Sequence, residues 1–119
     1  MNIQFSLVEK EKYLLFKSTD TYSFVDFKKL FEQINIKSKE LKCKRVFLDF
    51  SEVIGIIPDL DRYEIGEFVA FTMKFNVKIA VFDKQDNVNY FAETVAHNRG
   101  GNMRIFTNKE QALKWLLSS

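Results

Sequence analysis

The chain has few of the residues that build covalent or metal sites: one cysteine, one histidine, one proline and four glycines among 119 residues. The single cysteine, Cys43, forms no internal disulfide and has no second cysteine at metal-ligand spacing, so nothing indicates an oxidising compartment. The glycines form neither a dinucleotide-binding nor a Walker-type loop after any expected strand. We therefore expect no metal and no cofactor.

The sequence also lacks long apolar runs and a strong charge of one sign. No stretch approaches the roughly 20 apolar residues that span a bilayer, and the N-terminus lacks a signal-peptide pattern. The formal net charge is +2, which does not favour nucleic-acid binding. A local basic run over 37–45 falls at an expected helix end, where cations complement the carbonyl groups. We expect a cytoplasmic protein without a membrane span and without a nucleic-acid partner.

What the sequence does contain is the composition of one packed domain, with 46% hydrophobic and 29% charged residues. Apolar and polar residues alternate over 3–7, and a second extended run over 13–17 predicts a β-hairpin. Ser23, three residues before Asp26, predicts the start of a helix that ends near Leu41. We therefore expect a single domain over residues 1–119 that begins ββα.

Strands and helices alternate in the rest of the chain. The apolar run 46–50 predicts a central strand, and Pro58 predicts the first turn of a helix to about Lys74. The remaining expected elements are a strand over 77–82, a helix around 88–95, a strand over 103–106, and a last helix opened by a capping box of Thr107 and Glu110.

The order ββαβαβαβα predicts an α/β fold with a mixed, mainly parallel five-stranded sheet. Right-handed crossovers that move in one direction place the strands in sequence order, with the helices mainly on one face.

Two stretches carry a family resemblance. Residues 46–53, Val-Phe-Leu-Asp-Phe-Ser-Glu-Val, resemble the strand-and-turn signature of STAS domains, in which an apolar strand ends in an Asp-apolar-Ser turn. Residues 91–116 resemble small stand-alone bacterial STAS-like proteins, so the resemblance covers nearly the whole chain. It implies a STAS-like fold and a regulatory role like that of anti-sigma-factor antagonists.

The sequence departs from that family at its phosphorylation site. In anti-sigma-factor antagonists, a serine at the start of the helix after the central strand is phosphorylated by a partner kinase. An ungapped comparison places Pro58 and Asp59 where the family has two hydroxyl residues. We therefore expect no switching by phosphorylation at the usual site. Asp59 is either a fixed charge in the switch position or an acid that complements the helix dipole.

The leading functional prediction is a non-catalytic regulatory or scaffolding module that binds another protein or a second copy of itself. In open α/β sheets, ligands and partners gather at the carboxyl ends of strands, here the loop between Ser51 and Asp61. Asp59 and Arg62 are expected as charged contact residues. The predicted partner-binding residues are Ser51, Glu52, Ile56, Ile57, Asp59, Asp61 and Arg62.

An alternative function is a carrier of a small apolar ligand or lipid, because the architecture is similar to that of CRAL-TRIO domains. Thirteen phenylalanines are many for this length, and several aromatic residues recur along the second expected helix, although core packing is the favoured explanation for them. The residues expected to line such a site are Tyr63, Phe68, Phe71, Met73 and Phe75.

No set of residues predicts catalysis. Asp61 and Glu64 share a helix face, but Arg62 and Lys74 lie nearby, which favours a solvated surface. His97 has no motif partner to make it an acid, a base or a metal ligand. We therefore expect a protein that is not an enzyme.

Overall fold

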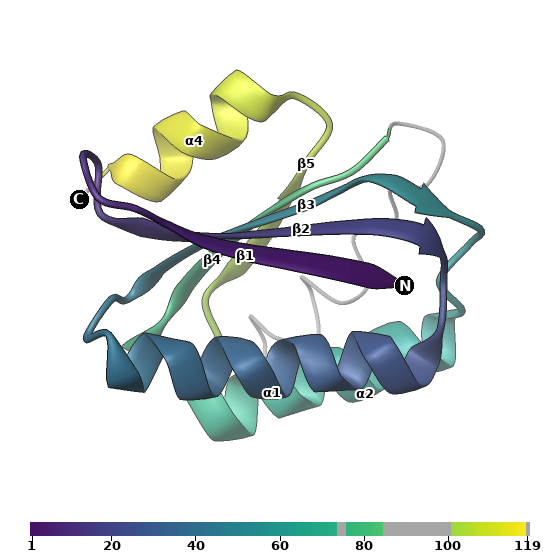
Figure 1. Cartoon of the computed structure of the whole chain (residues 1–119). Coiled ribbons are helices and arrows are strands. Elements are labelled where there is room, and N and C mark those ends of the chain that lie inside the picture. Colours follow the sequence, from purple (N-terminus) through teal and green to yellow (C-terminus); the bar gives the residue numbers. More distant parts are fainter. Residues whose placement is uncertain (74–75, 85–100, 119) are drawn as a thin grey trace.

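The computed structural model describes residues 1–73, 76–84 and 101–118. Figure 1 shows a central sheet with α1 and α2 on one face and α4 on the other. The predicted helix around 88–95 lies outside the described residues. The elements are β1 (Asn2–Val8), β2 (Tyr13–Thr21), α1 (Phe24–Glu40), β3 (Arg45–Ile54), α2 (Asp59–Phe68), the π-helical turn η1 (Val69–Met73), β4 (Lys78–Phe82), β5 (Met103–Phe106) and α4 (Lys109–Leu117).

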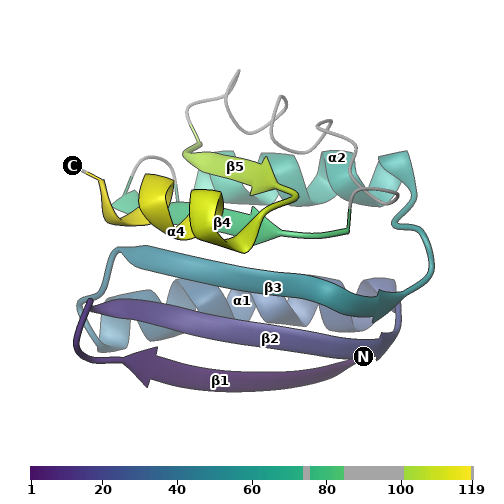
Figure 2. The same cartoon turned by 90° about the horizontal axis from the view of Figure 1, so that it is seen from above.

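The five strands lie in sequence order, β1-β2-β3-β4-β5. β1 pairs with β2 antiparallel, and the other three pairs are parallel. Figure 2 shows the strands side by side in this order, with α1 behind β2 and β3 and α4 in front of β4. The mixed, mainly parallel sheet that the sequence predicts is therefore confirmed.

The sheet separates two apolar clusters. Alternate side chains of β3 point to opposite faces, so Val46 and Leu48 join the main core with α1 and α2, whereas Phe47 faces α4. The smaller cluster consists of Phe47, Ala80, Ala112 and Leu116, each fully buried. α4 therefore covers the face of the sheet that α1 and α2 leave open.

Several predicted boundaries need correction. Ser23 is the N-cap of α1, as predicted, but Pro58 is the N-cap of α2 and does not lie in its first turn. The capping box of Thr107 and Glu110 is wrong: the side chain of Asn108 accepts from the main-chain N–H of Gln111 at 3.0 Å. Both Thr107 and Asn108 are good capping residues, and the chain uses the second.

The central strand is longer than its apolar run indicates. β2 continues to Thr21 and supplies backbone partners for Glu52, Val53 and Ile54, so β3 ends at Ile54. The register between β2 and β3 shifts between Lys17 and Thr19, which marks a β-bulge in β3. Ser51 and Glu52, expected in a loop, thus belong to a strand.

Candidate functional site

The candidate site is the connection from the end of β3 to the first turn of α2. It begins at Gly55, whose φ of +102° is a conformation that glycine adopts without steric cost. The preceding residue, Ile54, accepts a main-chain hydrogen bond from Tyr22 at 2.8 Å. The chain therefore leaves the sheet at a fixed point and turns sharply.

Asp49 and Ser51 organise the bulge in β3. One oxygen of the Asp49 carboxylate, Oδ1, accepts from the Ser51 main-chain N–H at 2.9 Å and from the Ser51 hydroxyl at 2.6 Å. Asp49 is buried, so these bonds compensate the carboxylate for lost hydration. The Asp-apolar-Ser signature has a structural role here, and the Ser51 hydroxyl points to Asp49.

A second tie joins α2 to the segment between β2 and α1. The hydroxyl of Tyr22 donates to Oδ2 of Asp61 at 2.7 Å. Burial, and secondly this carboxylate, raises the pKa of Tyr22 above its ordinary value. Tyr22 is therefore a protonated donor at neutral pH and holds Asp61 in place.

Arg62 lies beneath the loop. Its side chain is 4% exposed, and Nε donates to the main-chain oxygen of Ile57 at 2.9 Å. Burial lowers the pKa of Arg62, an effect opposed by Asp83 and Asp59. Ile57 is also buried. The prediction that Ile57 and Arg62 face a partner is therefore wrong, because both side chains hold the loop from inside.

The outer side of the same loop carries large aliphatic side chains. The exposed fraction is 60% for Ile54, 76% for Ile56 and 70% for Leu60. Pro58 and Asp59 are exposed between them. We call these five residues the β3–α2 surface.

Of the residues of this surface, Ile56 and Asp59 are among the predicted contact residues, whereas Ile54 and Leu60 are not. Leu60 lies in the first turn of α2, but its side chain is exposed. The buried positions of α2 and η1 are instead Arg62, Ile65, Gly66, Val69, Ala70 and Met73. Leu60 lies off this stripe. Glu52 is exposed at the end of β3, where it pairs with Lys17 at 2.8 Å.

The residues proposed to line an apolar ligand site do not gather around one cavity. Met73 is 1% exposed, whereas Phe71 is 64% exposed. Tyr63 and Phe68 are half-buried, and Phe75 lies outside the described residues. Beside α2, Arg62 and Ile65 line a cavity of only about 30 Å³, room for a water molecule but not for a lipid chain.

We also searched the described ranges for a metal site and for a membrane-spanning helix. Within residues 1–73, 76–84 and 101–118, no three histidine, cysteine, aspartate or glutamate side chains are grouped closely enough to hold a metal ion. His97 lies outside those ranges. Among the helices of the same ranges, none has both the length and the apolar composition needed to cross a membrane.

Comparison with known proteins identifies the fold. No family model matches the chain, and no curated protein matches it either. The structure is similar to the crystal structure of an uncharacterized protein of the DUF3478 family from Shewanella loihica PV-4, described as having a SpoIIAA-like fold. The TM-score is 0.58 at 18% sequence identity, over 97% of this chain and 92% of that one. The chain therefore has the SpoIIAA-like, that is STAS-like, fold that the sequence resemblance implies.

Proposed function

We propose that this protein is a non-catalytic interaction module of STAS type, which binds a partner protein through the β3–α2 surface. The observation that carries the proposal is the exposure of Ile54, Ile56 and Leu60, at 60%, 76% and 70%, within seven consecutive positions. Single exposed aliphatic residues are ordinary, but three on one short connection concentrate exposed apolar area there. Burying such a side chain is worth roughly 1.5–3 kcal/mol.

The loop that carries this patch is held in shape without a partner. Arg62 binds the main-chain oxygen of Ile57, Tyr22 binds Asp61, and the Asp49–Ser51 pair holds the bulge. A pre-organised surface loses less conformational entropy on binding than a mobile one. These three contacts therefore support a role for the loop in recognition.

In this proposal the negative charge of the β3–α2 surface comes from Asp59 and not from phosphorylation. Asp59 is exposed at the first position of α2, and Pro58 precedes it. These are the positions where the anti-sigma-factor antagonists that the sequence resembles carry hydroxyl residues. The nearby Ser51 hydroxyl donates to Asp49. We therefore propose a partner with an apolar surface and a cationic group opposite Asp59, and binding that does not depend on phosphorylation of this loop.

The test is affinity capture from the native cell lysate with matched variants. Ile56→Asp and Asp59→Lys each change an exposed side chain of the β3–α2 surface. Val25→Asp is the control, because Val25 is 61% exposed on α1, where an added acid in the first turn suits the helix dipole. We expect one protein to be captured by the wild type and by Val25→Asp, but lost with both surface variants.

Size-exclusion chromatography with light scattering distinguishes a foreign partner from a second copy. If the chain dimerises through the same surface, the wild type and Val25→Asp run as dimers, and Ile56→Asp runs as a monomer. Equal capture by all variants, with an unchanged oligomeric state, would contradict the proposal.

A further inference from the structure

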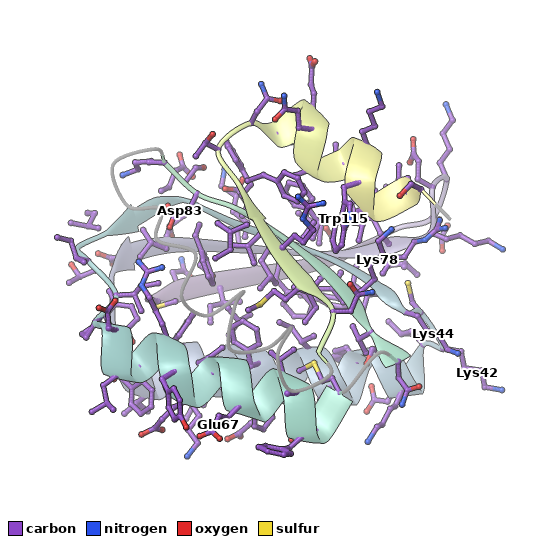
Figure 3. All side chains as sticks on the ribbon, turned by 180° about the vertical axis from the view of Figure 1, so that it is seen from behind. Lys42, Lys44, Glu67, Lys78, Asp83 and Trp115 are labelled. Atoms are coloured by element: carbon purple, nitrogen blue, oxygen red, sulfur yellow. The ribbon has the colours of Figure 1, made fainter. Side chains whose placement is uncertain are left out.

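A second feature lies at the other end of the sheet, where β3 begins. Two cavities adjoin there, with volumes of about 580 Å³ and 460 Å³. The first lies between the β1–β2 turn and the α1–β3 turn, and the second lies between the end of α1 and η1. Lys42 and Lys44 line both, and Figure 3 shows them projecting from the end of the molecule away from Asp83.

The walls of these cavities are strongly cationic. Lys12, Lys42, Lys44 and Arg45 line the first cavity with Glu9 as its one acid, and Lys39 lines the second. Within the described part of the chain, none of the five cations forms an ion pair. Lys78, nearby in β4, is already engaged, because its Nζ donates to the main-chain oxygen of Trp115 at 2.6 Å.

Complementing the end of α1 explains only part of this cluster. Main-chain N–H groups already occupy the last carbonyls of the helix: Leu41 donates to Lys37 at 2.9 Å, and Cys43 donates to Ser38 at 3.0 Å. Lys12 comes from a different segment, the β1–β2 turn. Helix capping, which the sequence indicates for the basic run 37–45, therefore accounts for only part of the cationic cluster.

Two of these lysines occupy backbone positions that favour glycine. Lys42 follows the C-cap of α1 with a φ of +51°, and Lys12 ends the β1–β2 turn with a φ of +58°. A helix that ends this way commonly has glycine at the position of Lys42. Among the described residues, three non-glycine residues have a positive φ, and two of them line the same cavity. Strained positions of this kind concentrate at functional sites.

The two strained turns are in contact. The Cys43 thiol lies 3.5 Å from the main-chain oxygen of Lys12, so the turn that carries Lys42 packs against the turn that carries Lys12. The cavity therefore brings its cations together from two segments 30 positions apart in the sequence.

We propose that the first cavity, of about 580 Å³, binds a small soluble molecule that carries a diphosphate or triphosphate group. Its volume falls within the range of small-molecule sites, roughly 300–1,000 Å³. Lysine and arginine form short, charge-assisted hydrogen bonds with phosphate oxygens. Leu7 and Leu41 in the same wall provide an apolar surface for the organic part of the ligand. The proposal is independent of the β3–α2 surface.

The test is titration with inorganic pyrophosphate, followed by amide NMR shifts and calorimetry. We expect saturable binding with shifts confined to residues around 9–12 and 39–45. In Lys12→Gly/Lys42→Gly, which keeps both turns in a residue that they favour, affinity falls roughly tenfold or more. The control Lys109→Ala/Lys114→Ala removes the same charge from exposed positions of α4 and leaves affinity unchanged.

Three results would overturn the proposal. The first is the absence of saturable pyrophosphate binding by the wild type. The second is an equal loss of affinity in both double variants, which indicates attraction by net charge alone. The third is binding to vesicles that contain phosphatidic acid without binding to pyrophosphate, which assigns the cluster to a membrane surface.

Discussion

Arg62 donates from Nε to the main-chain oxygen of Ile57 at 2.9 Å, and this bond lies inside the protein. It fixes the loop before α2 from beneath, while Ile56 and Leu60 remain exposed on the outer side. A cation in the core thus maintains an apolar surface.

Replacing Arg62 by methionine should therefore destabilise the protein. Methionine retains much of the buried apolar volume, but it leaves the Ile57 oxygen without this donor, at a cost of about 1–3 kcal/mol. Urea denaturation followed by circular dichroism measures the change in the free energy of unfolding. A change below about 0.5 kcal/mol, the range of ordinary surface substitutions, would show that the bond does not hold the loop.

The pair of Asp49 and Ser51 predicts unequal effects of two substitutions. Ser51→Ala removes one hydrogen bond, to Oδ1, at a cost of about 1 kcal/mol, whereas Asp49→Ala also leaves the main-chain N–H of Ser51 without its acceptor and costs about 2–3 kcal/mol. A double-mutant cycle measured by thermal unfolding should show coupling between the two positions. Strictly additive effects would argue against the pair as a unit.

The hydrogen bond from Tyr22 to Asp61 predicts a dependence on alkaline pH. Because the pKa of Tyr22 is raised in the folded state, its contribution to stability is complete below the ordinary tyrosine pKa of about 10 and is lost as the pH rises above it. Tyr22→Phe should lower the free energy of unfolding by about 1 kcal/mol at pH 8, and the difference should shrink by pH 11. A difference that is constant over this range would contradict the assignment.

The left-handed conformation of Lys42 predicts a substitution that stabilises the protein. Lys42→Gly should raise the free energy of unfolding by roughly 0.5–1 kcal/mol, since glycine adopts this φ without steric cost. The matched change Lys39→Gly, inside the last turn of α1, should lower it by up to about 1 kcal/mol. Two losses of similar size in thermal unfolding would show that position 42 carries no strain.

Periodicity and crossover rules predict most of this fold, because long alternating and helical patterns and right-handed connections leave few arrangements. Two features of the candidate site cannot be predicted by these rules. β3 extends past Phe50 through polar residues, since β2 is long enough to pair with them. In α2, the core-facing position that helical spacing assigns to an apolar residue is taken by Arg62, which moves Leu60 to the surface.

The burial of Arg62 depends on a contact that exists only in the folded structure. In the sequence, Arg62 stands close to Asp59 and Asp61, a pattern that favours an exposed side chain. The sequence does not show that the main-chain oxygen of Ile57 needs a buried donor. The basic cluster cannot be predicted from the sequence for a similar reason: Lys12 and Lys42 become neighbours only when the β1–β2 turn packs against the end of α1.

Photo-crosslinking in the native cell tests the account most directly. A benzoylphenylalanine at position 56 of the β3–α2 surface should yield one discrete crosslinked protein, which is absent when the same probe replaces Val25 on α1. A product that is absent at position 56, or identical at both positions, would contradict recognition through this surface.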